Sequence, residues 1–230
     1  MSSGLSPRLA AVAAFVKQGS PMADIGTDHA QLPIWLVESG WVPSALAMDV
    51  AAGPIRAARS SVELESSSVE VRVSDGMDQL RDGEVTTVTI CGMGGRTMAS
   101  ILSRGLPEIS SVERVVLQPQ GFNDRVRQAM LGMKWTCANA SIVQEKTKLY
   151  VVESWVRGDP SVPWCERDLR WGQNIRRGPD PLFRVWLERE IGAIDTGLQK
   201  LQRGAGSGHR DEERLRSERA VVARELAGLS

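Results

Sequence analysis

The chain has 230 residues, of which 42% are hydrophobic and 24% are charged, and its 28 basic side chains balance 28 acidic ones. Its apolar runs are only as long as strands, so we expect neither a membrane span nor a signal peptide and place the protein in the cytoplasm. A net charge of zero excludes a basic surface over the whole molecule, so a nucleic-acid partner would need a local basic patch.

The first predicted element is a helix over residues 7–16, because Ser6 can cap it and Pro7 suits its first position. Strand-like runs then alternate with helical segments such as 54–61, 97–103 and 123–131. The predicted strands are residues 22–25, 44–49, 69–75, 85–91, 114–119, 140–145 and 149–156.

Strands separated by helices imply right-handed crossovers and a mostly parallel sheet. The last two runs have no long helix between them, so we expect an antiparallel hairpin at the sheet edge. The sequence therefore predicts an α/β protein with about seven strands, whose ligands bind at the carboxyl ends of the parallel strands.

The composition changes after Trp155, where prolines and a glycine in residues 157–164 indicate a boundary. Apolar residues then recur at helical spacing: Phe183, Leu187, Ile191, Ile194, Leu198 and Leu201. A second helical stretch follows a glycine-rich break. We expect two domains, residues 1–157 and a C-terminal α-helical hairpin with a coiled-coil-like seam at 158–230.

Three aspartates end the first three predicted strands: Asp24, Asp49 and Asp75. An acid at the second strand's end can accept hydrogen bonds from a ribose diol, and Asp75, followed by Gly76, could reach an adenine ring. Each aspartate alone could equally reflect the preference of this residue for turns. Together they favour a nucleoside site.

The turn after the first strand, with Gly26 and Thr27, has one glycine where dinucleotide folds usually carry three. It also contains Asp28, which would repel a phosphate and attract a cation. S-adenosylmethionine (SAM), with its sulfonium, ammonium and no phosphate, fits this turn better than NAD. The sequence offers no metal-ligand spacing among its three cysteines, and we expect no metal.

After the fourth strand comes CGMGGRTM, in which Gly92, Gly94 and Gly95 offer a bare backbone floor for a flat acceptor. These glycines could instead serve a tight strand-to-helix turn.

Six segments in order, ADIGTDHAQLPIWLV, AMDVAAGPIRAA, VRVSDGM, ICGMGGRTMASIL, VVLQPQ and EKTKLYVVES, resemble the bacterial TrmK methyltransferases, which methylate N1 of adenine 22 in tRNA. The resemblance covers about residues 5–156. It implies a Rossmann-like class I SAM-dependent methyltransferase fold, SAM as cofactor and tRNA as partner. Two residues depart from the family pattern: Gln31 replaces an aromatic residue, and Gln120 replaces Asn.

The candidate residues follow from the motifs and this resemblance. The cofactor-binding set is Asp24, Gly26, Thr27, Asp49, Val50, Asp75, Gly76 and Gly92. The substrate-binding set is Gly94, Gly95, Arg96, Gln118, Pro119, Gln120, Arg125 and Arg127. The catalytic candidates are Asp28, which could stabilise the cationic adenine or accept its N6 proton, and His29. His29 could orient Asp28, contact the substrate or cap the next helix.

Several alternatives stay open. The C-terminal hairpin could present a tRNA-binding surface or form a homodimer. The substrate could be another RNA, a protein or a small molecule. A different class is an NAD-dependent oxidoreductase, because Asp49 also suits the NAD ribose, and a third is a catalytically silent RNA-binding relative, consistent with Gln120.

Overall fold

The computed structural model describes residues 4–178, 180–203 and 209–229. The chain divides into two compact units, Met1–Gly178 and Pro179–Ser230. The division falls later than the boundary expected after residue 157. No helix among the described residues is long and apolar enough to cross a membrane.

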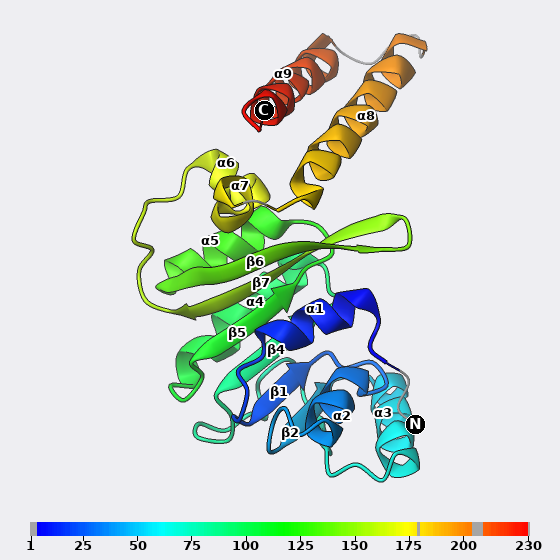
Figure 1. Ribbon diagram of the computed structural model, residues 1–230, viewed down its shortest axis with the longest axis vertical. Helices are drawn as coiled ribbons and strands as arrows, with labels where there is room; N and C mark the ends of the chain where they lie inside the picture. The colour runs from blue at the N-terminus through cyan, green and yellow to red at the C-terminus, as the bar shows by residue number, and fades with distance from the viewer. Residues whose placement is uncertain (1–3, 179, 204–208, 230) are drawn as a thin grey trace. The chain divides into compact units, whose positions relative to one another are not determined.

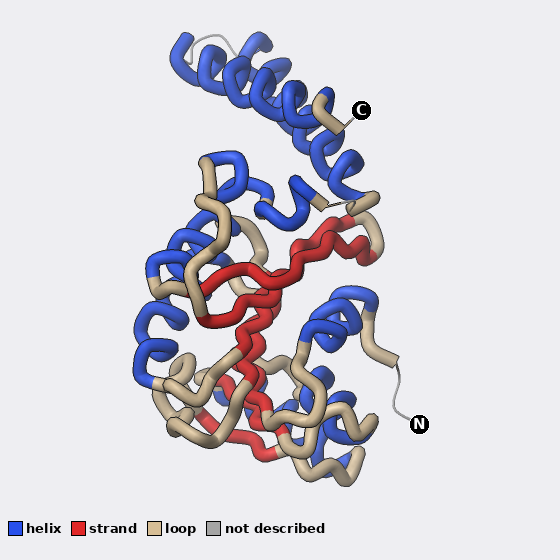
Figure 2. Tube along the Cα trace, turned by 60° about the vertical axis from the view of Figure 1, so that its left-hand side comes forward, coloured by secondary structure: helices blue, strands red, loops and turns tan. Residues whose placement is uncertain are grey.

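A seven-stranded sheet forms the centre of the first unit, with strands in the order β3-β2-β1-β4-β5-β7-β6. Figure 2 shows the strands in red. The strands are β1 (Met22–Ile25), β2 (Ala45–Asp49), β3 (Glu70–Val73), β4 (Thr87–Cys91), β5 (Arg114–Gln118), β6 (Trp135–Glu145) and β7 (Lys148–Arg157). The first five are mutually parallel, and β7 pairs antiparallel with both β5 and β6. The predicted α/β class, the parallel sheet and the edge hairpin are confirmed.

Helices cover both faces of this sheet, as Figure 1 shows. One face carries α1 (Pro7–Phe15), α2 (Gln31–Glu38) and α3 (Ala52–Leu64), and the other carries α4 (Gly95–Gly105), the short 3-10 helix η1 (Leu106–Glu108) and α5 (Asn123–Gly132). Each face has its own apolar core. Val12, Leu36 and Ala47 belong to the first core, and Ile25 and Met98 belong to the second.

The structure confirms the expected start of α1 at Pro7, where the Ser6 hydroxyl accepts a hydrogen bond from the Leu9 amide at 3.4 Å. Strand β6 begins at Trp135, earlier than predicted. The burial of its residues alternates irregularly, and the ladder shifts register between Cys137 and Asn139. The prediction missed the first half of β6 because that half lacks the apolar run of the second.

Two short helices that the sequence did not predict, α6 (Glu166–Trp171) and α7 (Gln173–Arg177), complete the first unit. Helix α6 packs on α5, and α7 packs on β6. These contacts explain why the first unit extends beyond residue 157.

The second unit contains α8 (Leu182–Arg203) and α9 (His209–Ala227), an antiparallel pair. Phe183, Leu187, Ile194 and Val222 of the two helices are buried. The Arg219 guanidinium lies 2.6 Å from the Asp195 carboxylate across the pair. The predicted helical hairpin is therefore present.

Candidate functional site

A pocket of about 510 Å³ opens where β1, β2, β3 and β4 end. This is the edge at which open parallel sheets bind their ligands. Five of the eight residues predicted to bind the cofactor line it: Gly26, Asp49, Val50, Asp75 and Gly76.

The turn after β1 forms one wall of the pocket. The amides of Gly26 and Thr27 both donate to the Met48 carbonyl, at 2.7 and 3.0 Å, which ties the turn to β2. Gly26 has a φ of +74°, and a Cβ there would lie 1.9 Å from the Cε of Met93. Glycine therefore permits both the left-handed backbone and the close approach of the β4 loop.

Asp24 and Thr27 lie just behind this wall, where both are buried. An Asp24 carboxylate oxygen accepts a 2.6 Å hydrogen bond from the Thr89 hydroxyl. Burial raises the pKa of Asp24 to about 6, although the bond from Thr89 opposes this rise. The Thr27 hydroxyl is buried close to the same carboxylate, and its hydrogen bond also lowers the pKa of Asp24.

The end of β2 forms the second wall. Oδ1 of Asp49 accepts a 2.7 Å hydrogen bond from the Ala51 amide, which holds the carboxylate beside the pocket. A carboxylate held in this way can accept further hydrogen bonds from vicinal hydroxyls. Val50, next in the chain, lines the pocket with an exposed apolar side chain.

The turn after β3 forms the third wall. The Ser74 hydroxyl donates to the Gly76 carbonyl at 2.9 Å and accepts from the Gln79 amide at 3.1 Å. Asp75 is exposed, and its carboxylate lies 2.9 Å from the Arg104 guanidinium. Part of its hydrogen-bonding capacity is therefore used by α4.

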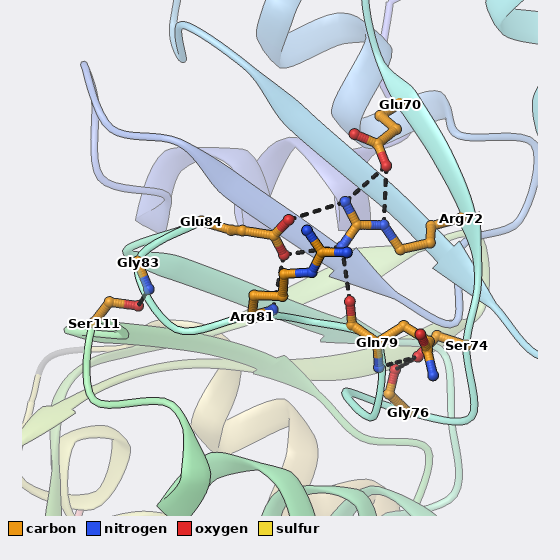
Figure 3. A network of polar contacts seen from close by, with 9 residues as sticks. All are labelled: Glu70, Arg72, Ser74, Gly76, Gln79, Arg81, Gly83, Glu84 and Ser111. Atoms are coloured by element: carbon orange, nitrogen blue, oxygen red, sulfur yellow. Dashed lines mark hydrogen bonds and ion pairs between the residues drawn. The ribbon is translucent and has the colours of Figure 1, made fainter.

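An arginine on β3 fastens the loop that follows this turn, as Figure 3 shows. The Arg72 guanidinium contacts the Glu70 and Glu84 carboxylates and donates to the Gln79 carbonyl at 2.7 Å. The bond from Arg72 lowers the pKa of Glu84. The network joins β3 to the middle and to the far end of residues 74–84, the segment that carries Asp75 and Gly76.

The two catalytic candidates lie on the surface of the turn after β1. Asp28 and His29 side chains are 81% and 56% exposed, and the His29 Nε2 lies 3.5 Å from an Asp28 oxygen. His29 does not cap α2, because the residue at the N-cap is Ala30 and no side chain bonds there. Both His29 and Ala30 have positive φ angles, a costly conformation for residues other than glycine that is common at functional sites.

The glycines after β4 are not equivalent. A Cβ on Gly94 would meet nothing within 4 Å, whereas a Cβ on Gly95 would lie 2.4 Å from the Phe122 carbonyl oxygen. The Gly95 amide also donates to the Gly121 carbonyl at 3.1 Å. Gly95 thus serves the packing of the start of α4 against residues 121–122, and the exposed backbone is that of Gly92 and Gly94.

One predicted substrate residue is wrong. Arg127 is 0% exposed, and its guanidinium bonds the Glu153 carboxylate at 2.7 Å and the Leu169 and Arg170 carbonyls at 2.8 Å. It therefore stabilises the packing of α5 on β7 and α6 and cannot reach an RNA phosphate. Arg125, half a turn earlier, is exposed.

The remaining substrate candidates differ in exposure. Gln118 and Pro119 are buried, and the Gln118 side chain accepts from Arg8 at 2.8 Å and donates to the Pro119 carbonyl at 3.1 Å. Gln120 is exposed. Its backbone amide donates to the Met93 carbonyl at 2.7 Å, and this bond joins the loops after β4 and β5. Arg96 is exposed and lines the pocket.

Sequence reasoning missed part of the pocket. Met93 and four residues of α4, namely Thr97, Ser100, Ile101 and Arg104, line it. The α4 residues occupy positions i, i+3, i+4 and i+7, so a helix face following the glycine-rich loop could have identified them. Arg8 of α1, which donates to the Gln118 side chain, was also missed, and no motif singles it out.

Comparisons with known proteins agree with this geometry. The family model described as a methyltransferase domain matches residues 5–152. The tRNA (adenine(22)-N(1))-methyltransferase of Bacillus subtilis (strain 168) is 35% identical over 150 residues, which make up 64% of this chain and 63% of that enzyme. The aligned part is thus slightly less than two thirds of the relative's length.

Solved structures resemble almost the whole chain. Streptococcus pneumoniae Sp1610, a candidate tRNA (m1A22) methyltransferase, has 30% identity and a TM-score of 0.89, covering 97% of this chain and 100% of that one. The same protein in complex with S-adenosyl-L-methionine gives a TM-score of 0.86. The B. subtilis M1A22 tRNA methyltransferase TrmK gives 25% identity and a TM-score of 0.86, covering 97% and 99% of the two chains.

Proposed function

Because this chain belongs to the TrmK family of tRNA (adenine(22)-N(1))-methyltransferases, we propose that it transfers a methyl group from SAM to N1 of adenine 22 in tRNA. The observation that carries the proposal is the pocket at the ends of β1 to β4, with Asp49 and Asp75 on its walls. A relative of 30% identity and the same fold binds SAM.

The residues at the pocket fit SAM. Asp49 would accept hydrogen bonds from the ribose diol, while Ser74, Asp75 and Gly76 would surround the adenine. The buried Thr27 hydroxyl and the buried Asp24 carboxylate would provide acceptors for the amino-acid end. The turn after β1 has a single glycine and carries Asp28, so it differs from the glycine-rich turn that holds a pyrophosphate in NAD-binding folds, which disfavours NAD.

SAM supplies an electrophilic methyl group on its sulfonium. Adenine N1 carries a free lone pair at neutral pH, so the protein needs no base to create the nucleophile. The exposed backbone of Gly92 and Gly94 lets a flat base approach closely, and catalysis consists largely of alignment. Asp28 is our candidate for stabilising the positive charge that develops on the adenine, with His29 3.5 Å away to orient it.

Substrate binding would use the basic side chains beside the pocket. Adenine N1 lies on the Watson–Crick edge, so the enzyme must take an unpaired base or extrude one. Arg96 and Arg125 are exposed and would contact the RNA backbone, which positions the substrate without reading its sequence. Gln118, the last residue of β5, and Pro119 are buried, so of these three candidates only the exposed Gln120 could contact the substrate directly.

We further propose that the α8–α9 hairpin provides a tRNA-binding surface, and that the protein acts in the cytoplasm, where its substrate resides. Homodimerisation through the hairpin is the competing role for this unit, because an apolar helical seam can continue into a partner. Sedimentation of the full chain alone and with tRNA would distinguish these two roles.

The function is tested by incubating the protein with an unmodified tRNA transcript and methyl-labelled SAM, followed by digestion and nucleoside analysis. We expect labelled 1-methyladenosine with the wild-type transcript and none when adenine 22 is replaced by guanine. Label in another nucleoside, in the protein or in no product would contradict the proposal.

A further inference from the structure

Phe122 is an exposed aromatic residue beside the pocket. It follows β5 in the QPQGF loop, and 51% of its surface is accessible to solvent. The guanidinium carbon of Arg96, a residue that lines the pocket, lies 4.2 Å from the centre of the Phe122 ring. A phenylalanine side chain has no hydrogen-bonding groups, but the face of an exposed ring can stack against another flat group.

The backbone holds Phe122 in place at an energetic cost. Its φ of +53° is left-handed, a conformation that disfavours a side chain by about 1–2 kcal/mol. The Gly95 amide bonds the Gly121 carbonyl, and Gly95 lacks the Cβ that would strike the Phe122 carbonyl. The backbone of residues 121–122 is thus held against the first turn of α4, and such retained strain points to a use for the position.

Two arginines flank Phe122, and the guanidinium of one of them, Arg125, lies 3.7 Å from the Asp124 carboxylate. Arg96 covers one side of the ring. The exposed Arg125 is in the first turn of α5, and its backbone amide donates to the Phe122 carbonyl oxygen at 3.1 Å. Proteins that hold unpaired nucleotides combine aromatic faces for the bases with positive side chains for the phosphates.

We propose that Phe122 and Arg96 form a stacking platform that binds one unpaired nucleobase of the substrate RNA beside the methyl-transfer pocket. This inference rests on the proposed function and adds a substrate-binding residue to it. The ligand class is a flat, uncharged base with an attached phosphate. The platform gives affinity and position and does not select among bases, because every base has a π face.

Four substitutions distinguish the contribution of the Phe122 ring from that of its backbone conformation. Phe122→Ala and Phe122→Gly both remove the ring, but glycine accepts the positive φ whereas alanine keeps its strain. Phe122→Leu keeps apolar surface without a π face, and Phe122→Trp keeps a larger π face. Leu64→Ala is the matched control, because Leu64 is 84% exposed at the far end of α3.

The measurements are the affinity for a fluorescently labelled tRNA transcript, the steady-state kcat/KM for tRNA, and the SAM-induced rise in melting temperature. We expect the alanine, glycine and leucine variants to lose about 5- to 150-fold in tRNA affinity and kcat/KM, as for one lost stacked base. Phe122→Trp and Leu64→Ala should behave like wild type, and all variants should keep the SAM response.

Wild-type tRNA affinity in both the alanine and the glycine variants would overturn the platform, as would a Phe122→Leu variant equal to Phe122→Trp. Because the binding assay needs no methyl transfer, the two hypotheses can fail separately. A wild-type protein that binds tRNA through Phe122 but transfers no methyl group would contradict the proposed function and leave the platform standing.

Discussion

The Thr89 hydroxyl donates a 2.6 Å hydrogen bond to the Asp24 carboxylate, in a buried position directly behind the pocket. Burial nevertheless raises the pKa of Asp24 to about 6 from 3.8. Because the folded pKa exceeds the unfolded one, the folded state binds the proton more tightly. The contribution of Asp24 to stability is therefore largest below pH 4 and declines until about pH 6.

Asp24→Asn should remove this pH-dependent contribution. The rise in the pKa of Asp24 corresponds to roughly 3 kcal/mol. When the pH is raised from 4 to 7, the free energy of unfolding of the variant should therefore increase by about that amount relative to wild type. Urea unfolding at these two pH values measures it. If the free energies of unfolding of wild type and variant differ by the same amount at both pH values, Asp24 titrates normally.

The same carboxylate predicts the pH dependence of SAM binding. If Asp24 receives the ligand's ammonium group, affinity should fall about tenfold per unit as the pH decreases below 6, because the protonated acid cannot make this contact. Calorimetric titration from pH 5 to pH 8 tests this. The Asp24→Asn variant should bind more weakly with no such decline, and an unchanged affinity in that variant would exclude the contact.

Substitution of Arg127 should lower the stability of the fold and not the affinity for RNA. Arg127→Met would leave the buried Glu153 carboxylate without its 2.7 Å partner, at a cost of about 3–5 kcal/mol. The double variant Arg127→Met with Glu153→Leu should recover most of this loss, since no buried charge then remains unpaired. Denaturant midpoints measure both, and a single variant that unfolds like wild type but binds tRNA poorly would restore the original interpretation of Arg127.

The two adjacent glycines after β4 provide a matched pair. Gly95→Ala should destabilise the fold and displace residues 121–122, because its Cβ would lie 2.4 Å from a carbonyl oxygen. Gly94→Ala meets open space and a permitted backbone angle, so it should fold normally. If Gly94 supports the target base, Gly94→Ala should lower methyl transfer without changing SAM affinity. Equal melting temperatures for the two variants would contradict the packing described for Gly95.

The position of the C-terminal cut should decide whether the first unit folds. A chain ending after Gly178 retains the Leu169 and Arg170 carbonyls that bind Arg127, so it should fold and bind SAM but lose tRNA methylation. A chain ending after Pro160 lacks these partners and should be markedly less stable. Circular dichroism melts and the methylation assay measure both, and full activity of the longer truncation would exclude the hairpin as an RNA-binding surface.

The sequence predicted the fold well, and five of the eight cofactor candidates line the pocket. Parallel strands end at one edge, so Asp49 and Asp75 could be placed together from the order of strands and helices alone. It did not predict that Asp75 would share its carboxylate with Arg104, which lies on another element. Pairing between distant elements depends on tertiary packing that a local pattern does not contain.

The substrate side was harder to predict for the same reason. Arg125 and Arg127 are two residues apart on a helix, which places them on different faces, but the sequence alone did not show which face is buried. Phe122 was missed because an isolated aromatic residue in a loop gives no periodic signal. Its significance comes from a left-handed backbone and a neighbouring arginine, both visible only in the structure.

The identity of the pocket's ligand is most directly measured by isothermal titration of the wild-type protein and Asp49→Ala with SAM and with NAD. We expect one SAM per chain for wild type, at least a tenfold loss for Asp49→Ala, as for hydrogen bonds to a charged group, and no saturable heat with NAD. Glu65→Gln, an exposed acid at the end of α3, is the control. Saturable NAD binding that depends on Asp49, with no binding of SAM, would contradict the account.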